Sequence, residues 1–159
     1  TILNHTLELN GKEFTPVIDA WSIPTGEILS VNDTPMDFTT AKKIGDHIDD
    51  NYDQLNFTTG YDHNYLVDSK ASYFAKLVGD KTHICMEAAT DLPGVQFYSG
   101  NFVDQLPGKE EAVYQKRDGL CLETQYYPNA VNEPEFPSPI LEKGETVTYW
   151  TTYDFSIED

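Results

Sequence analysis

One carboxylate has unusual neighbours: Glu123 lies in the segment Leu120-Cys121-Leu122-Glu123-Thr124-Gln125. Strand alternation predicts that Cys121, Glu123 and Gln125 share one face of a central strand, with the leucines on the other face. A carboxylate held this way between a thiol and a carboxamide is a candidate general base. A glutamate at a sheet edge, or one in a structural ion pair, would give the same pattern, so the residues alone leave both interpretations open.

Two further segments carry polar side chains that suit ligand binding. The first is Gly60-Tyr61-Asp62-His63-Asn64-Tyr65, whose rings, carboxylate and amide are typical of sites that bind sugars. The second is Pro93-Gly94-Val95-Gln96-Phe97-Tyr98, in which Gln96 and Tyr98 share a strand face. Structural alternatives are an Asx-type turn at Asp62 and a strand with one buried amide at Gln96.

Short strands must position these residues, because apolar side chains recur with a period of two along the chain. In Leu3–Leu9 the leucines share one face with His5, and Asn10-Gly11 then predicts a tight turn into Phe14–Val17. Later strands are expected at His83–Thr90, Val95–Ser99, Leu120–Tyr126 and Thr146–Phe155. With no repeat and no domain boundary, residues 1–159 are predicted to form a single all-β segment, an all-β sandwich.

Two stretches interrupt the strand pattern. A short helix is expected around Thr40–Asp50, where Thr39 or Thr40 can cap it and Ile44 and Ile48 lie four apart. The proline-rich stretch 127–139 is expected to be an ordered loop over a sheet, anchored by Phe136, Ile140 and Leu141.

Composition excludes several classes of partner. The formal charge of −17 repels phosphate backbones and anionic lipids, so neither nucleic acid nor membrane is expected as a partner. The aspartates from Asp46 to Asp53 lack the glycine and final glutamate of a calcium loop, so no metal site is expected. Cys85 and Cys121 lie in no ligand motif and are expected to be two thiols of a cytoplasmic protein.

The same segments, in order, resemble the aldose 1-epimerase (galactose mutarotase) family. The matching stretches are Thr15-Pro16-Val17, Ile23-Pro24-Thr25-Gly26-Glu27, Asp37-Phe38, Gly60-Tyr61-Asp62-His63-Asn64, Pro93 to Asn101, Leu122-Glu123-Thr124-Gln125, Pro128-Asn129-Ala130-Val131-Asn132, Phe136-Pro137-Ser138 and Thr152-Tyr153-Asp154-Phe155. They span nearly the whole chain. The resemblance implies the C-terminal part of a galactose mutarotase-like β-supersandwich.

The resemblance also implies an activity, the interconversion of α and β anomers of free aldohexoses. In the family the glutamate of Leu-Glu-Thr-Gln is the base, which corresponds to Glu123. The aspartate of Gly-Tyr-Asp-His binds sugar hydroxyls and the glutamine of Gly-Val-Gln-Phe-Tyr lines the pocket, which correspond to Asp62 and Gln96. His63 matches the position that supports the aspartate. The expected ligand is a monosaccharide, and no cofactor is implied.

The family's acid, a histidine in an Asn-His-x-Tyr-Phe-Asn-Leu motif, has no counterpart in the chain. Asn4-His5-Thr6-Leu7 imitates only the first letters and is followed by Glu8-Leu9, so His5 is not expected to be the acid. The expectation is a second chain or fragment that carries the N-terminal half and supplies the histidine. The alternatives are a non-catalytic carbohydrate-binding module and a glycosidase that uses Asp62 and Glu123.

Overall fold

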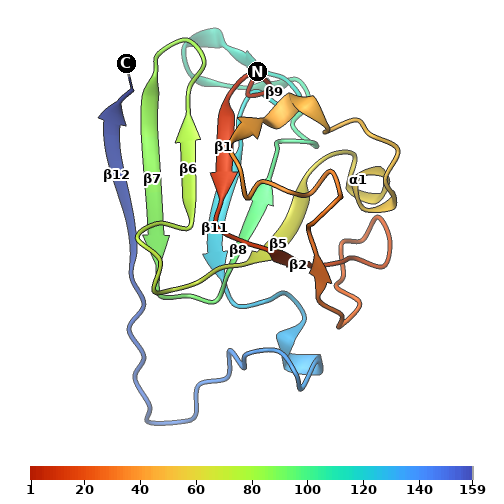
Figure 1. The fold of residues 1–159 in the computed structure, drawn as a ribbon, viewed down its shortest axis with the longest axis vertical. Coiled ribbons are helices and arrows are strands. Elements are labelled where there is room, and N and C mark those ends of the chain that lie inside the picture. The colour runs from red at the N-terminus through yellow and green to blue at the C-terminus, as the bar shows by residue number, and fades with distance from the viewer. Residues whose placement is uncertain (159) are drawn as a thin grey trace.

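The computed structural model describes residues 1–158, which form two five-stranded antiparallel sheets packed face to face (Figure 1). The first sheet has the order β12-β7-β6-β1-β4, and the second has the order β11-β8-β5-β2-β3. The prediction of an all-β sandwich is therefore confirmed. No helix among the described residues is long and apolar enough to cross a membrane.

The elements are short, as the many turn signals predict. The first sheet contains β1 (Thr6–Leu9), β4 (Lys42–Lys43), β6 (Ala75–Val78), β7 (Ile84–Thr90) and β12 (Thr151–Ile157). The second contains β2 (Glu13–Thr15), β3 (Leu29–Ser30), β5 (Asp62–Leu66), β8 (Gly94–Tyr98) and β11 (Cys121–Gln125). Outside the sheets lie the ribbon of β9 (Leu106–Pro107) and β10 (Val113–Tyr114), helix α1 (Asp53–Thr58), and the 3₁₀ turns η1 (Ile44–Asp46), η2 (Lys109–Glu111) and η3 (Ala130–Asn132).

Alternation places one face of each sheet in a common core. Leu7 and Leu9 of β1 are fully buried, as the pattern in Leu3–Leu9 predicts. Aromatic rings fill the space opposite them: Phe97 of β8 stacks on Tyr61 at 5.2 Å and meets Phe38 edge to face at 5.5 Å. Because this core occupies one face of β5, β8 and β11, Asp62, Gln96 and Glu123 lie on the other face.

The expected helix at Thr40–Asp50 is wrong. Lys42–Lys43 forms β4, which pairs with β1, and only Ile44–Asp46 makes a 3₁₀ turn. Ile44 and Ile48 are buried as the helical spacing required, but pairing with β1 fixes the backbone in an extended conformation before the turn. The α-helix lies a few residues later, at Asp53–Thr58.

The expected tight turn at Asn10-Gly11 is also wrong as a hairpin, because β1 and β2 belong to different sheets. The segment instead carries the chain across the sandwich, and the backbone N–H of Asn10 donates to the carbonyl of Phe74 at 2.7 Å. The Asn10-Gly11 pair thus indicated a change of chain direction, but it did not indicate which strand would pair with β1 or with β2.

The long connection between β11 and β12 is ordered at its start, as expected. Tyr127, Ala130 and Phe136 bury one another against Leu66 of β5, with the rings of Tyr127 and Phe136 edge to face at 5.2 Å. The other two expected anchors are wrong, since Ile140 and Leu141 are exposed. Beyond Phe136 the chain passes along the bottom of the sandwich in Figure 1 before it enters β12.

Candidate active site

Strand pairing brings the three candidate residues to one face of three neighbouring strands. Glu123 of β11 lies directly opposite Gln96 of β8, and Gln96 lies opposite Asn64 of β5. Asp62 is two residues from Asn64 on β5 and therefore shares its face. Directly opposite side chains in such pairs have Cβ atoms about 5 Å apart. The structure thus gathers Asp62, Gln96 and Glu123 on one polar surface, which we call the polar face.

Asp62 and Gln96 are joined by a hydrogen bond. The Gln96 carboxamide Nε2 donates to Asp62 Oδ1 at 2.8 Å, and both side chains are half-buried. Burial raises the pKa of the Asp62 carboxyl above its ordinary value, and the hydrogen bond from Gln96 offsets part of that rise. A half-buried carboxylate paired with a carboxamide presents both acceptors and donors, as recognition of sugar hydroxyls requires.

Glu123 lies at the edge of the sheet and not in a central strand as the sequence suggested. β11 ends the order β11-β8-β5-β2-β3, and the Glu123 side chain is exposed. Partial burial raises the pKa of the neighbouring Cys121 thiol, and the Glu123 carboxylate raises it further. The exposed Glu123 carboxylate thus lies beside the Cys121 thiol at the solvent-facing border of the polar face.

His63 lies behind Asp62, on the opposite face of β5. Its ring is fully buried, stands edge to face against Phe14 at 5.9 Å, and its Nδ1 accepts the backbone N–H of Asp62 at 3.2 Å. Desolvation by burial lowers the pKa of His63 to about 3. A neutral ring in this position steadies the backbone of Asp62 but cannot reach a ligand on the polar face.

The buried imidazole gives a prediction about pH. His63 has a folded pKa of about 3 and an unfolded pKa of ~6.5, so its neutral form stabilises the fold above pH ~6.5 and that stability is lost as pH falls toward 3. We expect His63→Gln to remove about 2 kcal/mol of the loss in unfolding free energy between pH 7 and pH 5.

Urea unfolding at the two pH values measures this effect. His47→Gln is the matched control, because His47 is half-exposed beside Asp50. Equal pH dependence in wild type and His63→Gln would contradict a buried, neutral His63.

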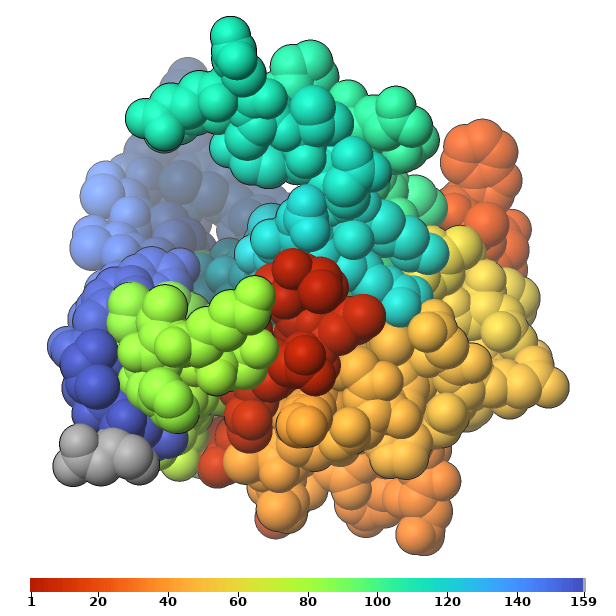
Figure 2. Space-filling model, turned by 90° about the horizontal axis from the view of Figure 1, so that it is seen from above, coloured from red at the N-terminus to blue at the C-terminus, as the bar shows by residue number. Residues whose placement is uncertain are grey.

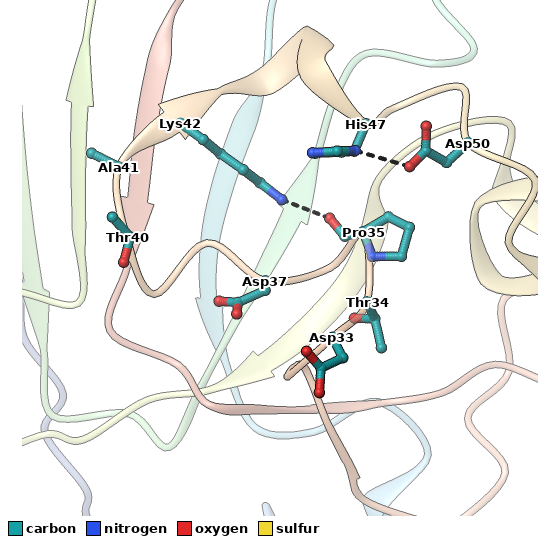
Figure 3. Close-up of a pocket in the computed structure, with 9 residues that line it drawn as sticks. All are labelled: Asp33, Thr34, Pro35, Asp37, Thr40, Ala41, Lys42, His47 and Asp50. Atoms are coloured by element: carbon teal, nitrogen blue, oxygen red, sulfur yellow. Dashed lines mark hydrogen bonds and ion pairs between the residues drawn. The ribbon is translucent and has the colours of Figure 1, made fainter.

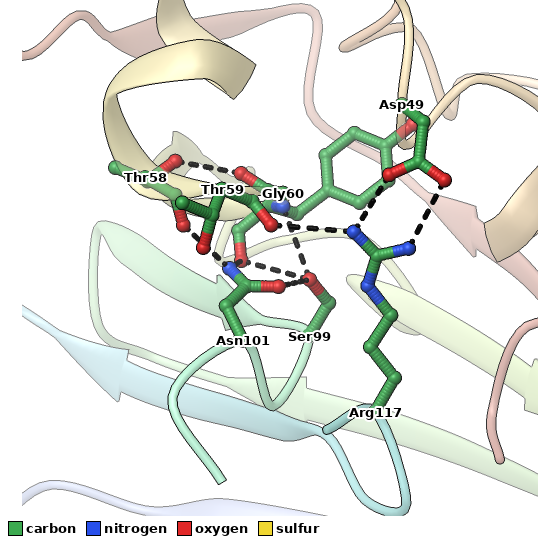
Figure 4. Close-up of polar contacts among 8 residues, drawn as sticks. Asp49, Thr58, Thr59, Gly60, Ser99, Asn101 and Arg117 are labelled. Carbon is green, nitrogen blue, oxygen red and sulfur yellow. Dashed lines mark hydrogen bonds and ion pairs between the residues drawn. The ribbon is translucent and has the colours of Figure 1, made fainter. Parts of the chain in front are cut away.

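A buried hydrogen-bond network fixes the turn that leads into Asp62 (Figure 4). Asn101 Nδ2 donates to the carbonyls of Thr58 at 3.0 Å and Tyr61 at 2.9 Å. Ser99 Oγ accepts the Tyr61 N–H at 3.0 Å and donates to Asn101 Oδ1 at 2.7 Å. The backbone of the residues before Asp62 is thereby held from three sides, which fixes where β5 begins.

Arg117 also acts on this turn and not on the polar face (Figure 4). Its guanidinium bonds both carboxylate oxygens of Asp49, at 2.8 and 3.3 Å, and donates to the carbonyl of Thr59 at 3.3 Å. The hydrogen bond from Arg117 lowers the pKa of the Asp49 carboxyl. The only arginine of the sequence is therefore part of the scaffold.

Of the remaining histidines, two lie beside aspartates, and His83 is exposed just before β7. His5 Nδ1 lies 3.0 Å from the carboxylate of Asp80, and His47 Nδ1 lies 2.9 Å from that of Asp50. Among residues 1–158 no group of three or more histidine, cysteine or acidic side chains is arranged to hold a metal ion.

A separate pocket of about 520 Å³ lies in the 33–50 region (Figure 3). It is lined by Asp33, Thr34, Pro35, Asp37, Thr40, Ala41, Lys42, His47 and Asp50. Its lysine is already engaged, since Lys42 Nζ donates to the Pro35 carbonyl at 2.9 Å and lies 4.3 Å from the centre of the Phe38 ring. None of the candidate site residues lines this pocket.

An apolar surface is open where the first sheet extends past the second. Tyr153, Phe155 and Ile157 of β12 and Ile84 of β7 share the inward face of the first sheet, and we call them the apolar edge. Phe155 is 68% and Ile157 67% exposed.

Nearby, a pocket of about 440 Å³ opens between the sheets, lined by Ile2, His5, Leu77, Met86, Leu120, Cys121, Leu122 and Tyr153. In Figure 2 the first residues (red) lie between the turn before β7 (yellow-green) and the start of β11 (cyan).

Sequence reasoning assigned no role to Asn64, Gln125 and Asn101, which the structure places in the polar face or its support. Gln125 Nε2 lies 3.2 Å from both Asn64 Oδ1 and Gln96 Oε1. Alternation alone placed Gln125 beside Glu123, but only the pairing of β11, β8 and β5 shows which amides meet.

The sandwich is the fold of galactose mutarotase-like proteins. It superposes on the crystal structure of the Caenorhabditis elegans GalM/aldose epimerase homologue with a TM-score of 0.82 at 26% identity, covering 100% of this chain and 47% of that one. The family model for aldose 1-epimerase matches residues 1–154, and the chain belongs to that family.

Individual relatives agree with this assignment. Over 159 residues the chain is 41% identical to human galactose mutarotase, covering 98% of this chain and 45% of that protein. It is 33% identical over 162 residues to the aldose 1-epimerase of Escherichia coli (strain K12), covering 99% and 46%. The chain thus spans about half the length of the curated relatives it matches.

Proposed function

We propose that this chain, as the C-terminal part of an aldose 1-epimerase domain, takes part in interconverting the α and β anomers of free aldohexoses. The observation that carries the proposal is the polar face, where Glu123, Gln96 and Asp62 lie on adjacent strands in a member of this family. Glu123 is the base, and Asp62 and Gln96 bind sugar hydroxyls.

The proposed reaction is a pair of proton transfers. The Glu123 carboxylate takes the proton of the anomeric hydroxyl while an acid protonates the ring oxygen. The bond from C1 to the ring oxygen breaks as the C1 carbonyl forms, the C1–C2 bond rotates, and the reverse steps close the ring on the other face. Acid assistance is needed because a carboxylate alone is a weak base toward a sugar hydroxyl.

We further propose that the acid is a histidine from the N-terminal half of the domain. Two observations support this. The chain spans about half of its relatives' length, and the apolar edge exposes large apolar side chains at a sheet border, as surfaces that associate with protein do. Docking there would also bring further residues toward Glu123, since Cys121 lines the pocket beside the apolar edge.

The docking proposal predicts a loss of association. We expect Phe155→Asp to weaken binding of the separately expressed N-terminal half by about 30-fold or more, because it places a charge where the complex would bury an aromatic ring. Val131→Asp is the matched control, since Val131 is 66% and Phe155 68% exposed and Val131 lies in η3. Titration calorimetry measures both. Equal affinities for the two variants would contradict docking at the apolar edge.

Polarimetry of the protein assembled with its N-terminal half, on freshly dissolved α-glucose or α-galactose, tests the activity, beside an assay for cleavage of a glycoside. Faster anomer equilibration without cleavage is the expected result. Glycoside cleavage without mutarotation would replace the proposal by a glycosidase that uses Asp62 and Glu123. Sugar binding without either reaction would favour a carbohydrate-binding module. We also propose a cytoplasmic location, which the two free cysteines, Cys85 and Cys121, support.

A further inference from the structure

The carboxamide of Asn64, which accepts a hydrogen bond from Gln125, occupies the space above Gly94. Gln125 pairs with Gly94 across β11 and β8, and Leu66 of β5 pairs with Gly94 on its other side. A Cβ on Gly94 would overlap Asn64 Oδ1 and lie 3.1 Å from the Tyr127 ring. The absence of a side chain at this position therefore lets the amides of Gln125 and Asn64 meet.

Gln125 donates two hydrogen bonds to neighbouring carboxamides. Its Nε2 carries two protons and lies 3.2 Å from Gln96 Oε1 and 3.2 Å from Asn64 Oδ1. Asn64 is 1% exposed and cannot easily turn away. With both donors occupied, the Gln125 amide is fixed relative to the sheet.

The orientation of Gln96 follows from this. Because Gln96 Oε1 accepts from Gln125, its Nε2 faces the opposite way, where it donates to Asp62 Oδ1 at 2.8 Å. Rotating the Gln96 amide by half a turn would set its Nε2 against the Nε2 of Gln125 and its oxygen against the Asp62 carboxylate. Both contacts of the rotated form are repulsive.

We propose that Gln125 is a positioning residue that fixes the orientation of the Gln96 carboxamide and so maintains the hydrogen bond donated to Asp62. Its side-chain hydrogen bonds go to Asn64 and Gln96 and not to Asp62, so it acts through Gln96. As a contribution to sugar binding, this inference rests on the proposed function, but the geometry of the amides does not. When a hydroxyl approaches Asp62, Gln125 keeps Gln96 from turning to follow it.

The ionisation of Asp62 reports on this arrangement without any sugar. Burial raises the pKa of Asp62, and the hydrogen bond from Gln96 opposes that rise. The other titratable groups on this side of the sheet are Cys121 and Glu123 on β11, Tyr98 opposite Asp62 on β8, and Glu13 opposite Leu66 on β2. Neutral substitutions of Gln125 leave the charges of all these groups unchanged, so they isolate the effect on the hydrogen bond.

The test compares Gln125→Met with Gln96→Met in the intact protein. Methionine keeps the length of the side chain and removes the donors. We expect Gln96→Met to raise the Asp62 pKa, measured from the carboxyl ¹³C shift, and Gln125→Met to raise it by a smaller amount. The two Nε2 protons of Gln96 should exchange faster with solvent in Gln125→Met. Gln115→Met is the matched control, because Gln115 is exposed and lies away from the polar face.

An unchanged Asp62 pKa and unchanged Gln96 amide exchange in Gln125→Met would overturn the proposal. So would an unchanged Asp62 pKa in Gln96→Met, because Gln125 then has nothing to act through. If mutarotation is observed, Gln125→Met should raise KM about two- to tenfold with little change in kcat, the effect of one hydrogen bond. Absence of mutarotation would contradict the proposed function and leave the two resonance measurements as the test of Gln125.

Discussion

Glu123→Gln is expected to lower the rate of anomer equilibration by about 10²- to 10⁴-fold, the usual contribution of a general base. A glutamine side chain has the size of a glutamate side chain, so the strand pairing of β11 with β8 stays intact. The carboxamide, however, cannot take a proton from the anomeric hydroxyl. Because Glu123 is exposed, its replacement should change the free energy of unfolding by less than about 0.5 kcal/mol. A loss of activity without a loss of stability is the signature of a reacting group.

Polarimetry of the assembled protein measures the rate, and urea unfolding measures the stability. Glu135→Gln is the charge-matched control, since Glu135 is exposed in the loop after η3. Retention of more than about a tenth of the wild-type rate in Glu123→Gln would remove Glu123 as the base.

Gly60→Ala is expected to lower the free energy of unfolding by about 3 kcal/mol or more, through the turn that precedes β5. Gly60 has φ +137°, a conformation that side-chain-bearing residues rarely adopt, and an added Cβ would overlap the Asn101 carboxamide oxygen. Asn101 cannot move aside without breaking its bonds to Ser99, Thr58 and Tyr61.

Gly119→Ala is the matched control for this prediction, because nothing lies within 4 Å of a Cβ at Gly119. We expect that variant to stay within about 0.5 kcal/mol of wild type. Any Gly60→Ala protein that remains folded should also bind sugar more weakly, since Asp62 lies only two residues after Gly60 and a shift of the turn would displace it. If Gly60→Ala lowered the free energy of unfolding by less than about 1 kcal/mol, the turn would relax at little cost and the prediction would be wrong.

The proposed assembly would supply what two surfaces of this chain are missing: an acid for the polar face and a covering for the apolar edge. The polar face would offer the proposed base and groups for sugar hydroxyls, but no histidine in the described part of the chain lies on it. His63 is buried behind β5, His5 and His47 lie beside aspartates, and His83 is exposed just before β7 of the other sheet. The apolar edge offers a surface on which further protein can be buried. A docked N-terminal half would meet both needs if it placed a histidine opposite Glu123.

Local pattern predicted β1, β7, β8 and β11 and the faces of their side chains, but it did not predict β4, β5 or β6. Period-two alternation placed Leu7 and Leu9 in the core and set Glu123 and Gln96 on the opposite face from Leu122 and Phe97, because successive side chains of a strand point to opposite sides. It also identified the segments that carry Asp62, Gln96 and Glu123, and their order along the chain was sufficient to identify the family.

Tertiary structure decided what depends on contacts between distant residues. Pairing with β1 turned Lys42–Lys43 from an expected helix into a strand, and sheet order made β11 an edge and left Glu123 exposed. The meeting of Gln125, Gln96 and Asp62 likewise required three strands that are far apart in sequence. Side-chain alternation is a property of each strand alone, whereas sheet order is set by the burial of the whole core. The sequence by itself therefore determined which residues could form the site, and only the fold determined how they face one another.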